Sequence, residues 1–384
     1  MHDTSRLRLH RLLLQDFRSY ATLDYSFCDS IIVVAGANGT GKTNLLEAIS
    51  LLSPGRGLRA AKGHELVRHG SAANQGWFVA GHFEAPAGPV TIGSGAEAGS
   101  DRRQFRLDGQ TIRSQSELSR RLALLWLTPQ MDRLFQESAG GRRRFLDRLV
   151  WSLEPGHARE VSAHDAAMTQ RNRLLAEGRH EQRWLAALED TMARHAVAAV
   201  AGRRATVARL NQTLEAGLVG HFPSARLSLL CPISDALQEK PALAVEEALR
   251  SHLSADRARD AAAGGARQGA HRTDLQMNLL PQGIPAALCS TGEQKALLVS
   301  IILAQAALVS AHRGFAPLLL LDEVAAHLDP GRREALFEGL AALPAQCFLT
   351  GTEAAPFTPL HGRAQFLAAI PGGLVPITDL PVPA

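Results

Sequence analysis

The chain has few cysteines and few of the larger aromatic side chains, and each shortage argues against a class of protein. Its 384 residues contain 4 cysteines, scattered without a CxxC pair. This spacing favours neither a zinc site nor a disulfide framework, and we expect a reducing, cytoplasmic location. With 2 tyrosines and 4 tryptophans, stacking platforms for single-stranded nucleic acid are scarce.

The chain also lacks a segment that predicts contact with a membrane. The N-terminal stretch MHDTSRLRLHRLLLQDFRSY carries charges throughout and has no small-residue cleavage site, unlike a secretory signal. The longest apolar run, 296–311, contains Ser300, Gln305 and Ser310. It falls short of the roughly 20 apolar residues that span a bilayer. We therefore expect no membrane partner.

What remains is a globular composition, 46% hydrophobic and 20% charged, with 41 Lys and Arg against 37 Asp and Glu. Strand-like runs dominate the first part, and Ala-, Leu- and Arg-rich helical patterns without a sustained heptad follow. We predict an α/β core split by an inserted, mainly helical lobe without a long coiled coil. The expected ranges are 1–140 and 261–384 for the core and 141–260 for the lobe. We expect 254–269 to be a mobile connection, and the tail from Ile370 to be irregular.

A glycine-rich loop gives the first chemical signal. GANGTGKT (36–43) fits G-x-x-x-x-G-K-[ST] and lies between a β-branched run, 31–35, and a helical pattern, 44–52. Glycines let the backbone direct its N–H groups at a phosphate chain, and a helix N-terminus adds a positive dipole end. The sequence thus predicts nucleotide binding by Gly36, Ala37, Asn38, Gly39, Thr40, Gly41, Lys42 and Thr43, with Lys42 on the β/γ-phosphates and Thr43 on Mg²⁺. The loop alone does not separate a kinase, a GTPase, a motor and an ATPase switch.

A pair of acids ends an apolar strand later in the chain, in PLLLLDE (317–323). A buried parallel strand delivers such side chains to the carboxyl edge of its sheet. We predict that Asp322 positions Mg²⁺ beside Thr43 and that Glu323 polarises the attacking water. A glutamate in this place favours an ATPase with its own base over a GTPase.

The stretch CSTGEQK (289–295) opens a long apolar helical pattern. Ser or Thr in this place is a good helix cap, and a cap alone would explain it. Ser-x-Gly-x-Gln before an Asp-Glu strand also resembles the signature motif of ABC-type ATPases. The resemblance implies that Ser290, Gly292 and Gln294 contribute to the ATP site of a second subunit in an ATP-dependent homodimer.

Two further positions resemble motifs of ABC-type ATPases. Gln130, in Thr128-Pro129-Gln130, resembles the Q-loop glutamine that contacts Mg²⁺ and water, although an exposed loop amide is the alternative. Asp329 resembles the D-loop aspartate, and a simple helix-capping acid is the alternative. Many ABC-type ATPases have a switch histidine where Gly351-Thr352-Glu353 follows the strand 347–350. We expect slow hydrolysis, or a substitute such as Thr352.

Longer stretches resemble the RecF family, which is related to the SMC ATPases. These stretches are LLLQDFRSYATLDYSF (12–27), LLSPGRGLRAAK (51–62), GRRRFLDRLVW (141–151), QRNRLL (170–175), GAHRTDL (269–275) and STGEQKALLVSIILAQA (290–306). Two positions depart from the family pattern, Ala270 where proline is expected and Gln130 where an acid is frequent. The resemblance implies a weak ATPase that dimerises on ATP and binds duplex DNA near single-strand gaps. It also implies action with RecR and RecO to load RecA.

The charge distribution agrees with a DNA partner. Residues 101–148 contain 11 arginines against 6 acids, a net charge of +5, and 54–70 carry four basic residues against Glu65, a net charge of +3. Such patches make sequence-independent, salt-sensitive phosphate contacts. We predict DNA contacts from Arg56, Arg59, Arg102 and Arg103, with a solvated surface as the alternative.

Other ATPase classes fit the sequence less well. The nucleotide-binding subunit of a transporter would have its signature motif much closer to the phosphate loop. An SMC-like structural clamp would need a long heptad arm. A nuclease fused to the ATPase would need room for another domain after Glu353.

Overall fold

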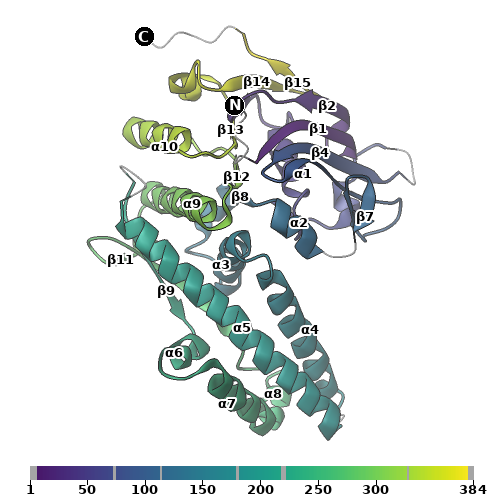
Figure 1. The fold of residues 1–384 in the computed structure, drawn as a ribbon, viewed down its shortest axis with the longest axis vertical. Coiled ribbons are helices and arrows are strands. Elements are labelled where there is room, and N and C mark those ends of the chain that lie inside the picture. Colours follow the sequence, from purple (N-terminus) through teal and green to yellow (C-terminus); the bar gives the residue numbers. More distant parts are fainter. Residues whose placement is uncertain are drawn as a thin grey trace. The chain divides into compact units, whose positions relative to one another are not determined.

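The computed structural model describes residues 7–71, 75–112, 115–178, 181–217, 222–326 and 328–378 (Figure 1). The chain forms two compact units. The first comprises Met1–Asp132 and Ser290–Ala384 with the segment Gly217–Pro223, and the second comprises Arg133–Ala216 and Ser224–Cys289. An α/β core is therefore split by a mainly helical unit, and the predicted fold class is confirmed.

A six-stranded sheet in the order β15-β14-β3-β13-β12-β8 forms the centre of the first unit. Its strands are β3 (Ile31–Ala35), β8 (Leu124–Leu127), β12 (Leu318–Leu321), β13 (Cys347–Gly351), β14 (Gln365–Ile370) and β15 (Gly373–Pro376). All neighbours are parallel except the β14–β15 pair. The parallel strands are continuous apolar runs because both faces of such a sheet are covered. Their carboxyl ends meet at one edge, where β3 and β12 deliver the phosphate loop and the two acids.

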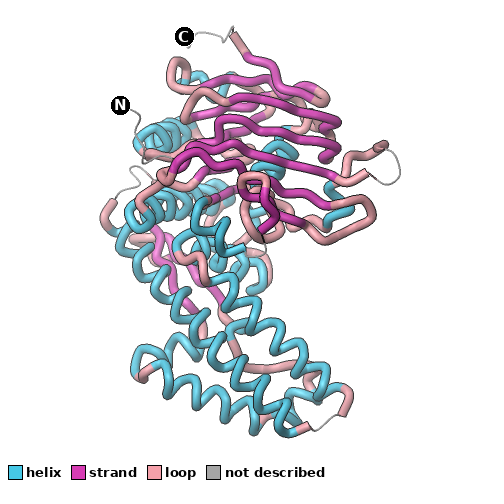
Figure 2. The backbone as a smooth tube through the Cα atoms, turned by 45° about the vertical axis from the view of Figure 1, so that its right-hand side comes forward, coloured by secondary structure: helices cyan, strands magenta, loops and turns pink. Residues whose placement is uncertain are grey.

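A second, antiparallel sheet in the order β2-β1-β4-β5-β6-β7 belongs to the same unit (Figure 2). Its strands are β1 (Arg8–Phe17), β2 (Tyr20–Ser26), β4 (Trp77–Ala85), β5 (Gly88–Ala96), β6 (Gln104–Leu107) and β7 (Gln110–Ile112). Asp108 and Gly109 make the β6–β7 turn with φ of 48° and 81°, as the Asp-Gly pair predicts. The short elements of this unit are η1 (Gly63–Leu66), α2 (Gln115–Arg121), η2 (Pro129–Arg133) and η5 (Ala355–Leu360).

Three longer helices complete the first unit: α1 (Lys42–Ser50), α9 (Thr291–Arg313) and α10 (Pro330–Ala342). Helix α1 contacts β1 and β4 of one sheet and β13 of the other, so it lies between the two sheets. Among the described residues, α9 alone is long and apolar enough to cross a bilayer, and 72% of its apolar window is buried. Burial of that extent is typical of a core helix.

The second unit is built around two long helices, α4 (His157–Ala176) and α5 (Gln182–Glu215), which pack along each other. The other helical elements are α3 (Ala139–Leu153), α6 (Pro232–Glu239), α7 (Ala242–Ala255), α8 (Arg257–Ala262), η3 (Ala270–Arg272) and η4 (Ala286–Leu288). A small sheet in the order β11-β10-β9 completes it, from β9 (Ala225–Leu230), β10 (Asp274–Leu279) and β11 (Ile284–Pro285). Buried apolar residues of α4, α5 and α7 form one cluster, which gives a compact lobe.

The stretch 254–269, expected to be a mobile connection, differs from that expectation. It contains α8, and within α8 Asp260 is buried and accepts a 2.8 Å hydrogen bond from Arg171 Nη1. Arg171 is 0% exposed and also donates to Glu189 Oε1 at 3.0 Å and to the Leu253 carbonyl at 2.6 Å. The Ala/Gly/Arg composition suggested a mobile segment, because it does not show that Asp260 is buried against Arg171, which is distant in sequence.

Two further expectations differ from the structure. Residues 133–140 and 261–289, expected in the core, fall in the second unit, where β10 pairs along its whole length with β9. The tail from Ile370 is not wholly irregular, since β15 turns back to pair with β14. Residues 379–384 of that tail lie outside the described residues.

Candidate nucleotide site

The loop between β3 and α1 has the conformation that its glycines predict. Gly39 and Gly41 have φ of 86° and 106°, in the left-handed region that glycine adopts without strain. A Cβ on Gly36 would lie 2.7 Å from the Ala369 carbonyl oxygen, and one on Gly41 would lie 2.7 Å from Ser19 Oγ. Side chains are excluded here both by conformation and by space, so the backbone stays open to a close ligand.

Lys42 begins α1 and is buried. Its Nζ donates to the carbonyls of Gly36 at 2.7 Å and Ala37 at 3.2 Å, and lies 3.5 Å from Glu323 Oε1. The ammonium is therefore held over the loop, within reach of the second predicted acid. This is the position from which a lysine can bind phosphate oxygens.

Thr43 and Asp322 are in direct contact, although 279 residues separate them in sequence. Thr43 Oγ1 lies 2.9 Å from Asp322 Oδ2 and 3.1 Å from Oδ1. A hydroxyl and one carboxylate are the hard oxygen ligands with which a protein holds Mg²⁺ beside phosphates and water. The described residues contain no cluster of three or more His, Cys, Asp or Glu able to hold a metal by itself.

Glu323 is the second residue after β12 and has a φ of 49°, an uncommon conformation for a glutamate. Its N–H donates to Thr350 Oγ1 at 3.0 Å, and Thr350 Oγ1 donates to Asp322 Oδ1 at 2.6 Å. Lys295 Nζ donates to the Glu323 carbonyl at 2.9 Å. Hydrogen bonds to its N–H and to its carbonyl thus hold Glu323 in this strained conformation. Strained residues held in this way are common at functional sites.

Thr350 and Lys295 belong to the candidate nucleotide site, although no sequence motif predicted a role for them. Thr350 is fully buried on β13, whereas Thr352, the proposed substitute for a switch histidine, is exposed. Lys295 is buried on α9, and burial lowers its pKa, while Asp132, Glu323 and Asp322 act in the opposite direction. The available signal was a lysine between the Ser-x-Gly-x-Gln motif and the apolar helical pattern that follows it.

The residues that resemble the signature motif, the D-loop and the Q-loop lie on other elements than the phosphate loop. Ser290 caps α9 by accepting from the Glu293 N–H at 3.3 Å, and Glu293 Oε2 accepts from the Ser290 N–H at 2.8 Å. Asp329 caps α10 by accepting from the Arg332 N–H at 2.9 Å. Gly292 lies in the first turn of α9 and Gln294 is buried, while Gln130 is exposed in η2. No hydrogen bond between described residues joins Ser290, Asp329 or Gln130 to residues 36–43.

The four arginines predicted for DNA differ in their environments. Arg56 and Arg102 are exposed, and neither side chain makes an ion pair with a described residue. Arg59 donates to Asn44 Oδ1 at 2.8 Å and to the buried Glu47 at 3.1 Å. Arg103 donates to the Ser53 and Gly55 carbonyls, and its guanidinium lies 4.4 Å from the centre of the Phe105 ring. Burial lowers the pKa of Arg103 to about 10.

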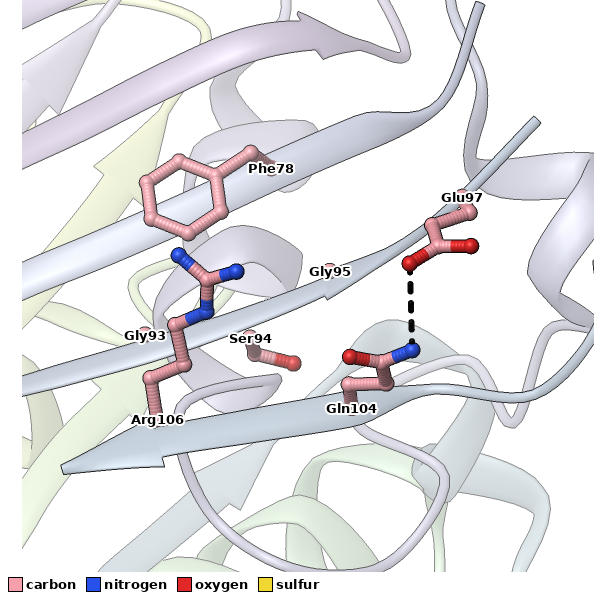
Figure 3. Close-up of a pocket in the computed structure, with 7 residues that line it drawn as sticks. All are labelled: Phe78, Gly93, Ser94, Gly95, Glu97, Gln104 and Arg106. Atoms are coloured by element: carbon pink, nitrogen blue, oxygen red, sulfur yellow. Dashed lines mark hydrogen bonds between the residues drawn. The ribbon is translucent and has the colours of Figure 1, made fainter. Parts of the chain in front are cut away.

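The first unit has a hollow that Arg56 and Arg103 line, and another on the face of its antiparallel sheet. One, of about 440 Å³, is lined by Leu51, Gly55, Arg56, Ala61, Lys62, Gly63, Leu66, Trp77, Asp101 and Arg103. The other, of about 140 Å³, lies on the sheet face beside Phe78 and Arg106, where Gly93 and Gly95 lack side chains (Figure 3). Gln104 donates to Glu97 at 3.4 Å along its rim. Only the first hollow contains residues that the sequence predicted to contact DNA.

Comparison with known proteins agrees with the geometry. The family model described as RecF/RecN/SMC N terminal domain matches residues 8–358. Relatives described as DNA replication and repair protein RecF occur in Mesorhizobium japonicum and Agrobacterium fabrum. The first is 45% identical and the second 46%, over 98% and 97% of this chain and 99% of each relative.

Solved structures show the same fold. One of the recombination mediator protein RecF with ATPrS, in the RecFOR pathway, superposes with a TM-score of 0.84 at 21% identity, covering 97% of this chain and 99% of the other. An Smc head domain from Pyrococcus furiosus superposes with a TM-score of 0.53 at 15% identity, covering 97% and 96%. The identity and coverage of the sequence relatives settle the family: the chain belongs to the RecF family of DNA replication and repair proteins.

Proposed function

We propose that the protein is an ATP-dependent DNA-binding switch of gap repair, with weak ATPase activity. The observation that carries the proposal is the convergence of Lys42, Thr43, Asp322 and Glu323 on one sheet edge, by direct contacts. A phosphate-binding loop beside a carboxylate and a second acid is the arrangement that phosphoryl transfer to water requires.

In this proposal, each residue at the sheet edge has one role. The loop N–H groups and Lys42 bind the phosphates. Thr43 and Asp322 would hold Mg²⁺, which would supply positive charge to the phosphate chain. Glu323 orients the water and accepts its proton. Thr350 fixes both acids, since its hydroxyl bonds to each of them. Gln130 would contact Mg²⁺ and the water.

ATP would also join two copies of the chain. Ser290 caps α9, and no hydrogen bond between described residues links Ser290 to its own phosphate loop. A helix N-terminus favours a bound anion. We infer that Ser290 and Gly292 act on the ATP of a second copy, related by a two-fold axis. Gln294 and Asp329 would support that interface.

The partner on which the switch acts is duplex DNA near single-strand gaps. Arg56 and Arg102 support this part of the proposal, since they are exposed basic side chains without an ion partner among the described residues. Membership of the RecF family supports action with RecR and RecO to load RecA, and a cytoplasmic location.

A mixing experiment tests the shared site. Lys42→Ala disables the nucleotide site on the chain that carries it. Ser290→Arg blocks the nucleotide site on the partner chain, so each homodimer should be inactive. A mixed dimer regains one intact site, and an equal mixture should recover about a quarter of wild-type ATP hydrolysis. If both variants fold and no mixture recovers hydrolysis, the shared-site mechanism is wrong.

A further inference from the structure

We propose that Lys295 is a positioning residue, which couples the signature end of α9 to the turn that carries Glu323 in the same chain. The inference rests on the proposed function, because it assigns a role within the ATPase site. It adds to that function a physical link between two parts of one protomer. One part is the N-terminus of α9, which meets the nucleotide of the partner, and the other is Glu323, which acts on the nucleotide of its own protomer.

The contacts of the Lys295 ammonium carry the inference. Its side chain is 3% exposed, and Nζ donates to the carbonyls of Glu323 at 2.9 Å and Ala326 at 2.5 Å. The Glu323 carbonyl also accepts the Ala326 N–H at 3.2 Å, so both carbonyls belong to one tight turn after β12. A buried ammonium is costly unless hydrogen bonds compensate it. These two carbonyls provide that compensation and fix the turn relative to α9.

The turn needs such support because Glu323 is in the left-handed region, with φ of 49°. An L-residue there is strained by roughly 1–2 kcal/mol. Thr350 supports the N–H side of Glu323, and Lys295 supports the carbonyl side. Together they set the direction in which the carboxylate leaves the backbone, toward Lys42.

Lys295 and Ser290 lie on the same part of α9, so a change at one can affect the other. Ser290 caps the helix and Lys295 lies in the second helical turn, so one rigid segment holds both. A force on Ser290 from a partner's γ-phosphate would be transmitted by that segment to the Glu323 turn. Each site of the dimer would then sense the occupancy of the other.

A Lys295→Met substitution keeps an unbranched side chain about as long as the aliphatic stem of lysine and removes the ammonium. We expect ATP affinity and ATP-dependent dimerisation to stay near wild type, and kcat to fall about 100-fold, as for a misplaced catalytic group. Lys295→Arg, which keeps the charge, should restore part of kcat. The exposed Lys240→Met in the second unit is the matched control and should leave kcat unchanged.

Pairwise mixing separates positioning of Glu323 from support of the signature motif. Suppose that Lys295 positions Glu323 of its own chain. In a mixed dimer, the Lys295→Met and Ser290→Arg substitutions then disable the same composite site and leave the other site intact. The mixture of Lys295→Met with Ser290→Arg should then recover hydrolysis, and the mixture with Lys42→Ala should not. The opposite pattern would show that Lys295 serves the signature motif, and would overturn the proposal.

The remaining outcomes also decide the proposal. An unchanged kcat in Lys295→Met overturns it, and so does unfolding of both Lys295→Met and Lys295→Arg, because the residue would then be merely structural. Failure of the mixture of Lys42→Ala with Ser290→Arg rejects the shared site itself. A selective loss of kcat in the Lys295→Met homodimer would still support the positioning of Glu323, so the two failures can be told apart.

Discussion

Thr350 Oγ1 donates a 2.6 Å hydrogen bond to Asp322 Oδ1. The same oxygen accepts the N–H of Glu323, so one hydroxyl on β13 fixes both acids that follow β12. This relationship makes a threonine on the neighbouring strand part of the candidate site. It also implies that the geometry of the two acids depends on the pairing of β12 with β13.

Replacing Thr350 with valine should impair the site more than the fold. Valine has the same shape, but it leaves the Glu323 N–H without its acceptor, which costs about 1–3 kcal/mol for a buried group. We expect a corresponding loss of stability in urea denaturation and a clear fall in ATP hydrolysis. The exposed Thr352→Val is the control. If Thr352→Val lowers hydrolysis and Thr350→Val does not, Thr352 is the functional residue.

How far the sequence predicts this site depends on how local each signal is. The loop 36–43 and the pair Asp322-Glu323 are contiguous motifs, and the structure brings them together at one sheet edge. Thr350 and Lys295 act through contacts between segments distant in sequence, which no motif spacing encodes. The element ranges were predictable where a strand is a continuous apolar run, as for β3.

The helical unit was less predictable, for a related reason. Its composition indicates helices, but not which polar side chains are buried among them. Arg171, within QRNRLL, and Asp260, within an Ala/Gly/Arg-rich stretch, form a buried ion pair that sets α8 against α4. From the sequence alone a charged residue is expected to be exposed, because the sequence does not show which residue would pair with it in the interior.

Removal of Arg171 should therefore destabilise the second unit strongly. Arg171→Met leaves the carboxylates of Asp260 and Glu189 with fewer partners inside the protein, although Arg257 still pairs with Glu189. Breaking a buried pair in this way costs about 3–5 kcal/mol, to be measured by chemical denaturation. The control is Arg173→Met, whose partner Glu177 lies on the surface, and we expect little change from it. Equal losses from both variants would contradict a specific role of the buried pair.

The stability of the second unit should also depend on pH through His271. Burial lowers the pKa of His271 below its ordinary value of 6.5, and the neighbouring His164, Arg272 and Arg143 lower it further, although the Ala266 carbonyl opposes them. As pH falls below 6.5, the unfolded chain binds a proton that the folded chain resists, and stability decreases. Denaturation between pH 7.5 and about 5 measures this slope, and His271→Gln should reduce it. The exposed His361→Gln should leave it unchanged, and an unaltered slope in His271→Gln would reject the assignment.

Gly41 and Gly88 separate two reasons for a glycine, because their φ values are 106° and 104°. A Cβ on Gly88 would meet nothing within 4 Å, whereas one on Gly41 would lie 2.7 Å from Ser19 Oγ. Gly88→Ala should cost about 1 kcal/mol from backbone strain alone and preserve ATP binding. Gly41→Ala should cost more and abolish ATP binding, as measured by calorimetry. Retained ATP binding in Gly41→Ala would contradict the role of this loop.

The arginines predicted to bind DNA should divide into two groups by their surroundings. Arg56→Ala and Arg102→Ala each remove an exposed cation, so each should weaken binding to gapped duplex and reduce the salt slope of log K by about 1 per lost phosphate contact. Arg103→Ala should instead destabilise the fold, because Arg103 holds the 53–55 backbone and covers Phe105. Fluorescence anisotropy with ATP at several salt concentrations measures the first effect, and urea denaturation the second. Arg226→Ala, an exposed arginine of the second unit, is the control. An unchanged salt slope in both Arg56→Ala and Arg102→Ala would move the DNA surface away from this part of the first unit.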